Sequence, residues 1–84
     1  MSAAMRPIFI MVKCEPGAAY DVAADALDTI EQVSEVYSIS GQYDLLVKCN
    51  LPTEMDVGRF VTGQIQMLKH VKDTQTIITF NAFT

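Results

Sequence analysis

The sequence is poor in basic residues and in long apolar runs, and each shortage excludes a class of protein. Six lysines and arginines are scattered among ten acids, for a formal charge of −4, so nothing in the chain attracts a nucleic-acid backbone. The longest apolar stretch, residues 8–12, is too short to span a bilayer, and no signal sequence precedes it. We therefore expect a cytoplasmic protein that contacts neither nucleic acid directly nor a membrane.

Residues suited to metal binding and catalysis are also scarce. The two cysteines, Cys14 and Cys49, belong to no Cys-x-x-Cys pair, and the single histidine, His70, is remote from both in sequence. No phosphate-binding loop, nucleophile elbow or metal signature occurs. The sequence predicts two reduced thiols, no metal, no cofactor and no catalytic residue.

What the chain has in abundance is apolar residues, which form 50% of its 84 positions. That share is well above what a disordered segment shows, so the chain should fold, and its length allows one domain (residues 1–84) with one core. Apolar residues alternate as in strands or recur at helical spacing. The expected elements, in chain order, are a strand at 6–14, a helix at 18–32 with Leu27 on its buried face, strands at 36–39 and 43–49, a stop at 50–52, a helix that follows Thr53 as N-cap, has Asp56 in its first turn and runs to about 68, and a strand at 71–80.

A weak internal repeat supports a fold of two similar halves. Residues 33–39 and 71–77, each following a predicted helix, both fit Val-x-acid-x-x-hydroxyl-Ile. Two β-α-β halves predict an α+β fold of the ferredoxin-like type, β-α-β-β-α-β, with an antiparallel sheet in the spatial order 4-1-3-2 and both helices on one face.

The first and last strands of the chain are apolar on both faces. Phe9 and Met11 alternate with the core residues of the first strand, and Ile78 and Phe80 alternate with Ile77 in the last. The face of an antiparallel sheet that is open to water should be polar, and a large apolar patch marks an interface. We therefore expect a homodimer in which two sheets pack face to face, as in a dimeric α/β barrel.

Residues 41–44, Gly-Gln-Tyr-Asp, form the most distinctive segment. Gly41 and Asp44 suit the turn of a β-hairpin, but a turn does not require Gln42 and Tyr43. Thr74 and Thr76 open the last strand at the same end of the sheet, on the opposite edge, roughly 14 Å away across three strand spacings. From the residues alone, two interpretations stay open. These polar groups either hold a zwitterion across a subunit interface, or they only cap a turn and favour a strand.

The segment 41–47 (Gly-Gln-Tyr-Asp-Leu-Leu-Val), followed by Val71-x-x-Thr74-x-Thr76-x-Ile78, resembles the C-terminal effector domain of the leucine-responsive/asparagine-type (Lrp/AsnC) transcription regulators, also called the RAM domain. The resemblance covers nearly the whole chain. It implies transcription regulation by a ferredoxin-like domain that dimerises through its sheets, assembles into a ring such as an octamer or decamer, and binds an amino acid between dimers. The positions that it assigns to the effector site are Gly41, Gln42, Tyr43, Asp44, Thr74 and Thr76.

The chain departs from that family in two respects. Regulators of the family carry an N-terminal helix-turn-helix domain, so the sequence predicts an effector domain without a DNA-binding domain, acting through mixed assembly with full-length regulators. Lys69-His70 also stands where Pro-Gly is common before the last strand. Two alternative functions remain: a small dimeric barrel enzyme of the monooxygenase type, with an enclosed cavity within each subunit, and another ferredoxin-like ligand-binding module.

Overall fold

The computed structural model describes residues 4–83 as a four-stranded sheet with helices on one side. The elements, in chain order, are β1 (Met5–Cys14), α1 (Ala19–Thr29), β2 (Val33–Ser38), β3 (Leu45–Pro52), α2 (Val57–Phe60), the π-helix η1 (Val61–Ile65) and β4 (Val71–Ile78). The predicted order of elements is therefore confirmed. Among residues 4–83, no helix combines the length and the apolar character that crossing a membrane requires.

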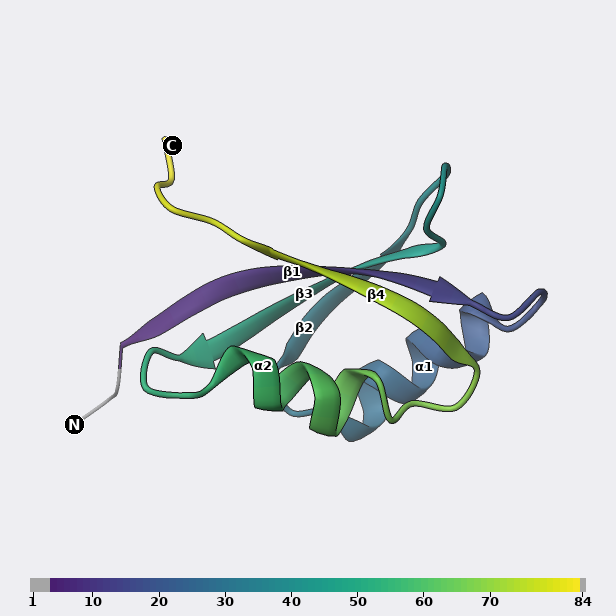
Figure 1. Cartoon of the computed structure of the whole chain (residues 1–84), viewed down its shortest axis with the longest axis horizontal. Helices are drawn as coiled ribbons and strands as arrows, with labels where there is room; N and C mark the ends of the chain where they lie inside the picture. Colours follow the sequence, from purple (N-terminus) through teal and green to yellow (C-terminus); the bar gives the residue numbers. More distant parts are fainter. Residues whose placement is uncertain (1–3, 84) are drawn as a thin grey trace.

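The sheet has the strand order β2-β3-β1-β4 and is antiparallel throughout, as the ferredoxin-like prediction required. β1 lies in the centre, with Ile8 opposite Cys49 of β3 on one side and Ile78 of β4 on the other. Figure 1 shows α1 and α2 beneath the sheet, while no helix covers its upper face. The right-hand end of that view gathers the β1–α1 turn, the β2–β3 turn and the start of β4.

The core lies between the sheet and the helices. Ile8, Ile10 and Val12 of β1 are at most 1% exposed, and Leu45, Val47, Cys49 and Leu51 of β3 continue the same layer. Phe60 and Ile65 close it from the helical side. Each fully buried aliphatic or aromatic side chain contributes about 1.5–3 kcal/mol to folding, so this layer supplies most of the stability of so small a domain.

The helix-free side of the sheet, called the open face here, is largely apolar. In antiparallel strands, residues directly opposite each other point to the same side. The register therefore places Phe9 and Met11 of β1 on the open face, with Leu46, Tyr37 and Ile77 beside them on the neighbouring strands. Phe80 and Phe83 follow β4 and are 95% exposed. The chain thus has the doubly apolar strands that its sequence predicts.

The second helix differs from the sequence prediction. Its α-helical part ends at Phe60, and residues 61–65 continue as a π-helix, in which Gln66 N–H donates to the Val61 carbonyl at 2.8 Å. Gly63 and the β-branched Thr62, whose hydroxyl donates to the Gly58 carbonyl at 3.0 Å, weaken regular α-helix here.

The predicted N-cap, Thr53, was also wrong. Its N–H donates to the Ala4 carbonyl at 3.0 Å, which keeps Thr53 tied to the start of β1. Asp56 is the N-cap, and its carboxylate accepts the N–H of Arg59 at 3.0 Å. The helix therefore begins one turn later than the Thr53 prediction requires.

Further boundaries differ: β4 ends at Ile78 rather than at 80, and β3 begins at Leu45 rather than at 43. β3 runs through Pro52, which lies opposite Met5 at the end of the ladder, so the predicted stop at 50–52 was wrong. β2 begins at Val33 rather than 36, and α1 ends at Thr29, whose hydroxyl donates to the Asp25 carbonyl at 2.6 Å. Leu27 was expected in the core but is 50% exposed, because Val22 and Ala26 take the buried positions of α1.

Candidate functional site

Residues 41–44 form the turn between β2 and β3, as the sequence predicted. Gly41 has φ of +118°, a backbone conformation that side chains with a Cβ rarely adopt, so glycine is needed at this position. The N–H of Ile39 donates to the Asp44 carbonyl at 3.0 Å and closes the hairpin. The turn therefore has a fixed shape, with Gln42 exposed and Tyr43 partly exposed at its tip.

Asp44 fastens this turn to the end of β1. Its Oδ2 accepts the N–H of Cys14 at 2.8 Å, and its own N–H donates to the Val12 carbonyl at 2.9 Å. A charged acceptor for a partly buried N–H is a strong interaction, because the amide would otherwise lose its hydrogen bond on burial. Burial, and then the charge of Asp44, raise the pKa of the Cys14 thiol. Asp44 therefore has a structural role in the chain, whatever else it contacts.

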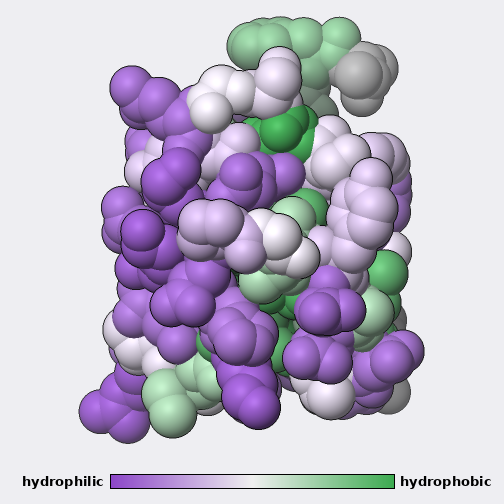
Figure 2. Space-filling model, turned by 90° about the vertical axis from the view of Figure 1, so that its right-hand side faces the viewer, coloured by the Kyte–Doolittle hydropathy of each residue, from purple (hydrophilic) through white to green (hydrophobic). Residues whose placement is uncertain are grey.

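Gln42 and Tyr43 line a surface depression of about 330 Å³ together with Lys13 of β1 and Asp73 of β4. Lys13 Nζ donates to the Gln42 carbonyl at 3.2 Å and forms one wall. Figure 2 views the end of the molecule where this turn, β1 and β4 meet, and shows a mostly hydrophilic surface with apolar patches between the polar side chains. The depression combines opposite charges, an amide and a phenol ring within one subunit.

Thr74 and Thr76 point the other way. They lie opposite Val12 and Ile10, which are core residues, so both threonines are on the helix side of β4. The Thr74 hydroxyl accepts a hydrogen bond from Gln66 Nε2 at 2.9 Å. Because Val12 has Leu45 on one side and Thr74 on the other, the end of the turn lies about 10 Å from Thr74, two strand spacings rather than three. Within one subunit the threonines and the turn do not share a face.

Sequence reasoning missed Lys13 and Asp73. They are direct partners across β1 and β4, at the last regular pair before a register shift between Lys13 and Cys14. A β-bulge of this kind often re-aims side chains near a functional site. The signal was available in the expected strand order, which makes the end of β1 and the start of β4 neighbours. Their charges, however, look like ordinary surface residues in a linear sequence.

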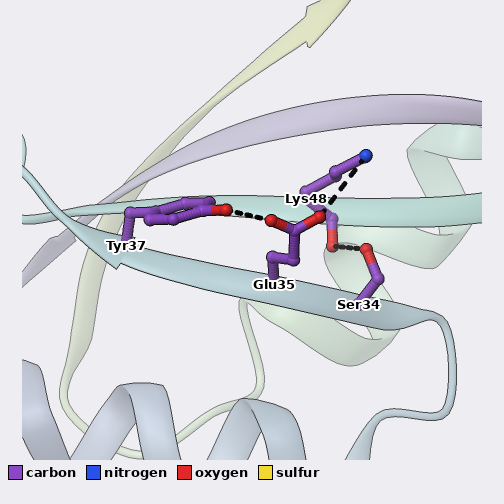
Figure 3. Close-up of polar contacts among 4 residues, drawn as sticks. All are labelled: Ser34, Glu35, Tyr37 and Lys48. Carbon is purple, nitrogen blue, oxygen red and sulfur yellow. Dashed lines mark hydrogen bonds and ion pairs between the residues drawn. The ribbon is translucent and has the colours of Figure 1, made fainter.

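A second polar cluster lies on the open face, on the edge strand β2 and its neighbour β3 (Figure 3). Glu35 of β2 accepts a hydrogen bond from the Tyr37 hydroxyl, and its carboxylate pairs with Lys48 Nζ of β3 at 3.5 Å. The Tyr37 hydrogen bond lowers the pKa of Glu35, and Lys48 lowers it further. The same carboxylate raises the pKa of the Tyr37 phenol. This cluster places charged groups on a face that is largely apolar, and Lys13 and Asp73 lie on the same face at the end of the sheet.

The remaining candidate groups have structural surroundings. Cys14 and Cys49 are free and buried, and burial raises the pKa of the Cys49 thiol to about 11. Because Cys49 lies opposite Ile8, six positions before Cys14, the two thiols are about 20 Å apart along β1, too far for a disulfide. His70 Nδ1 lies 3.5 Å from Glu15 Oε2 on the surface. Within residues 4–83, no three His, Cys, Asp or Glu side chains gather as metal ligands would.

The space between helices and sheet is filled by side chains. Ile30 of the α1–β2 connection, Phe60 and Ile65 are at most 5% exposed there. The depression at Gln42 and Tyr43 opens on the surface instead. One of the surface depressions of the described residues thus lies at the end of the sheet where β1, β4 and the β2–β3 turn meet, and others lie beside Gln32.

Comparison with known proteins agrees with this architecture. The sequence pattern of the family described as the Lrp/AsnC ligand binding domain matches residues 8–84. An HTH-type transcriptional regulator of Pyrococcus abyssi is 31% identical over 75 residues, which are 87% of this chain and 50% of that protein. The chain therefore spans about half the length of the curated relatives that it matches.

Solved structures show the same fold over nearly the whole chain. A hypothetical protein of Pyrococcus horikoshii, 28% identical, superposes with a TM-score of 0.78 and covers 95% of this chain and 94% of its own. A transcriptional regulator of Neisseria meningitidis, solved as a complex with L-Met, reaches a TM-score of 0.80 at 18% identity, with 94% of this chain and 52% of that chain covered. The second likeness is one of fold. With the family pattern matching all but the first seven residues, this chain belongs to the Lrp/AsnC ligand-binding domain family.

Proposed function

We propose that this chain is an amino-acid-sensing module that dimerises through its open face and regulates transcription by assembling with DNA-binding relatives. The observation that carries the proposal is the depression lined by Gln42 and Tyr43, at the end of a sheet whose helix-free face is apolar. A site with opposite charges and an aromatic ring suits a small zwitterion. Its family and its HTH-type relatives supply the regulatory context.

The proposed site extends across subunits. Gly41, Gln42, Tyr43 and Asp44 supply one side, with Asp44 holding the turn on β1. Thr74 and Thr76 of another subunit supply the second side, because within one chain they face the helices. Such a site lies between dimers and is complete only in a larger assembly, for which we propose a ring, an octamer or a decamer.

The open face supports the proposed dimer. Phe9, Met11 and Leu46 lie there side by side on neighbouring strands, and water contact with such a patch is unfavourable. A second copy offers the same patch in return, which is the arrangement of a two-fold symmetric dimer. The Glu35–Lys48 pair lies on the same face and would help to fix how the two sheets align.

The proposed chemistry is binding and not catalysis. His70, the side chain with the most suitable reactivity, is exposed and contacts Glu15 on the surface. The interior that a small barrel enzyme would use is occupied by Phe60, Ile65 and Ile30. Regulation would then proceed in the cytoplasm through mixed assembly with a full-length Lrp/AsnC-type regulator.

A thermal-shift screen of the twenty amino acids, combined with sedimentation, tests the proposal. At 100 times its dissociation constant, an effector should stabilise the fold by about 2.7 kcal/mol. Thr76→Val removes one hydroxyl at nearly constant volume and should weaken binding by about 0.5–1.5 kcal/mol. The proposal fails if no amino acid shifts the transition, or if the protein sediments as a monomer at micromolar concentration.

A further inference from the structure

Lys13 and Asp73 are opposite charges on directly paired residues that do not contact each other. They face each other across β1 and β4, where side chains on one face approach within about 5 Å at Cβ. Such a pair would ordinarily form a salt bridge, yet within residues 4–83 neither side chain takes part in one. Lys13 turns instead to the carbonyl of Gln42, at 3.2 Å.

Each charge is held by a backbone group of its own surroundings. Asp73 Oδ1 accepts the N–H of Thr74 at 2.9 Å, which fixes the carboxylate beside its own strand. The Lys13 ammonium has three N–H donors, and the Gln42 carbonyl accepts one of them. Both groups therefore keep hydrogen-bonding capacity for a molecule that lies between them.

The space between the two charges is the depression of about 330 Å³ described above. Its other walls, Gln42 and Tyr43, belong to the β2–β3 turn, which Asp44 fixes to β1. A positive group on one side and a negative group on the other match the carboxylate and the ammonium of an α-amino acid. The ring of Tyr43 provides an apolar surface for a side chain.

We infer that Lys13 binds the α-carboxylate and that Asp73 binds the α-ammonium of a free amino acid. These two residues then determine the ligand specificity of the effector site. The assignment rests on the proposed function and specifies which molecules the site accepts. A free zwitterion satisfies both charges. An amino-acid amide has no carboxylate for Lys13 to bind. An N-acetylated amino acid has no ammonium for Asp73 to bind.

The test compares three probes on the full chain: the amino acid that gives the largest thermal shift, its amide and its N-acetyl derivative. Titration calorimetry on the parent protein should show the free amino acid binding about 10- to 100-fold more tightly than either derivative, since a charge-assisted contact is lost each time. Lys13→Gln should lower the affinity for the free amino acid by a similar factor and abolish discrimination against the amide. Asp73→Asn should abolish discrimination against the N-acetyl derivative only.

Matched controls remove the same charges elsewhere on the surface. Lys69→Gln and Asp28→Asn alter exposed residues outside the depression and should leave all three affinities within about twofold of the parent. Binding of the amino acid by Lys13→Gln and Asp73→Asn with parental affinity and selectivity would overturn the inference while leaving the proposed function intact. A parent protein that binds no amino acid would overturn both.

Discussion

The carboxylate of Asp44 accepts the backbone N–H of Cys14 at 2.8 Å, joining the β2–β3 turn to the end of β1 across 30 residues of sequence. The turn that carries Gln42 and Tyr43 is thereby positioned against Lys13, the neighbour of Cys14. Asp44, which the sequence predicts as a ligand contact, thus has a structural role in holding the turn against β1. Its effect on binding and its effect on stability can be separated by substitution.

Replacing Asp44 with alanine should destabilise the fold by about 1–3 kcal/mol, because the partly buried Cys14 N–H loses its acceptor. Asp44→Asn keeps an oxygen in place and should cost less. Urea denaturation measures both. We also expect Asp44→Ala to lose the ligand-induced thermal shift while remaining a dimer, and Asp44→Asn to keep the shift. Loss of the shift in both variants would assign the ligand's ammonium to Asp44 instead of Asp73.

His70→Gly should be more stable than His70→Ala by about 1 kcal/mol, the cost of a left-handed backbone for a residue with a Cβ. His70 has φ of +71° and its carbonyl accepts the Glu15 N–H at 2.9 Å, which holds the residue in that conformation. Both variants lose the exposed contact with Glu15, so their difference isolates the backbone. Equal melting temperatures for the two would show that the turn relaxes when histidine is removed.

Phe9→Asp should break the dimer. The substitution places a charge in the middle of the open face, where a sheet-to-sheet interface would bury it without a partner. Phe80→Asp tests the segment after β4 in the same way. The control is Tyr20→Asp on α1, where the ring is 81% exposed on the helical side. Sedimentation at micromolar concentration should show dissociation of the Phe9→Asp variant and an unchanged assembly of the control. The Phe80→Asp variant dissociates as well if the segment after β4 is part of the interface.

Stability should fall as the pH rises from 9 towards 11. Burial raises the pKa of the Cys49 thiol from 9.0 to about 11, so the unfolded chain loses this proton first. The contribution of the neutral thiol is complete below pH 9, decreases through this window and is lost above the folded pKa. Denaturation curves at several pH values should show the decrease in the parent and a smaller one in Cys49→Ala. Identical slopes would mean that the Cys49 thiol ionises freely in the folded state.

Tyr37→Phe should raise the pKa of Glu35, because the phenol hydrogen bond is the main reason that this pKa is low. A depressed carboxyl pKa stabilises the fold above about pH 4.5, and that stabilisation is lost as the pH falls through the folded pKa. Titration of the Glu35 side chain by NMR measures the change directly. Lys48→Met, which removes the charge and the hydrogen bond of Lys48, should also raise the pKa of Glu35. An unchanged Glu35 pKa in Tyr37→Phe would contradict the assignment of the Tyr37 hydrogen bond as the main cause.

The order of strands and helices could be predicted because each element has a clear hydrophobic period. Ile8, Ile10 and Val12 alternate strictly and become the buried face of β1. Helix ends were less predictable, because they depend on hydrogen bonds made at a distance. Thr53 is suited to an N-cap by residue type, but its N–H is bound by Ala4, and Asp56 takes the capping position instead.

The candidate site was predictable only in part. The turn at Gly41 follows from local chemistry, and its positive φ agrees. The face of the sheet on which the Thr74 side chain lies depends on the strand register, which the sequence alone does not determine. A one-residue shift of β4 would move Thr74 to the opposite face. Lys13 and Asp73 become neighbours through the same register, so residues with no distinctive pattern come to line the depression.

The central position of β1 also determines how this domain must form. Its ladder with β3 links residues about 40 positions apart, and its ladder with β4 brings Ile8 opposite Ile78. Pairings over such sequence separations require large loops to close before they stabilise anything, which slows folding relative to a helical bundle of similar size. Within this domain β1 leaves the ribosome before the other three strands, and it acquires its second neighbour only when β4 has been synthesised. Until then, one edge of β1 has unpaired backbone groups that can pair with an extended strand of another chain. A second copy of this protein can supply such a strand, which favours misassembly during folding.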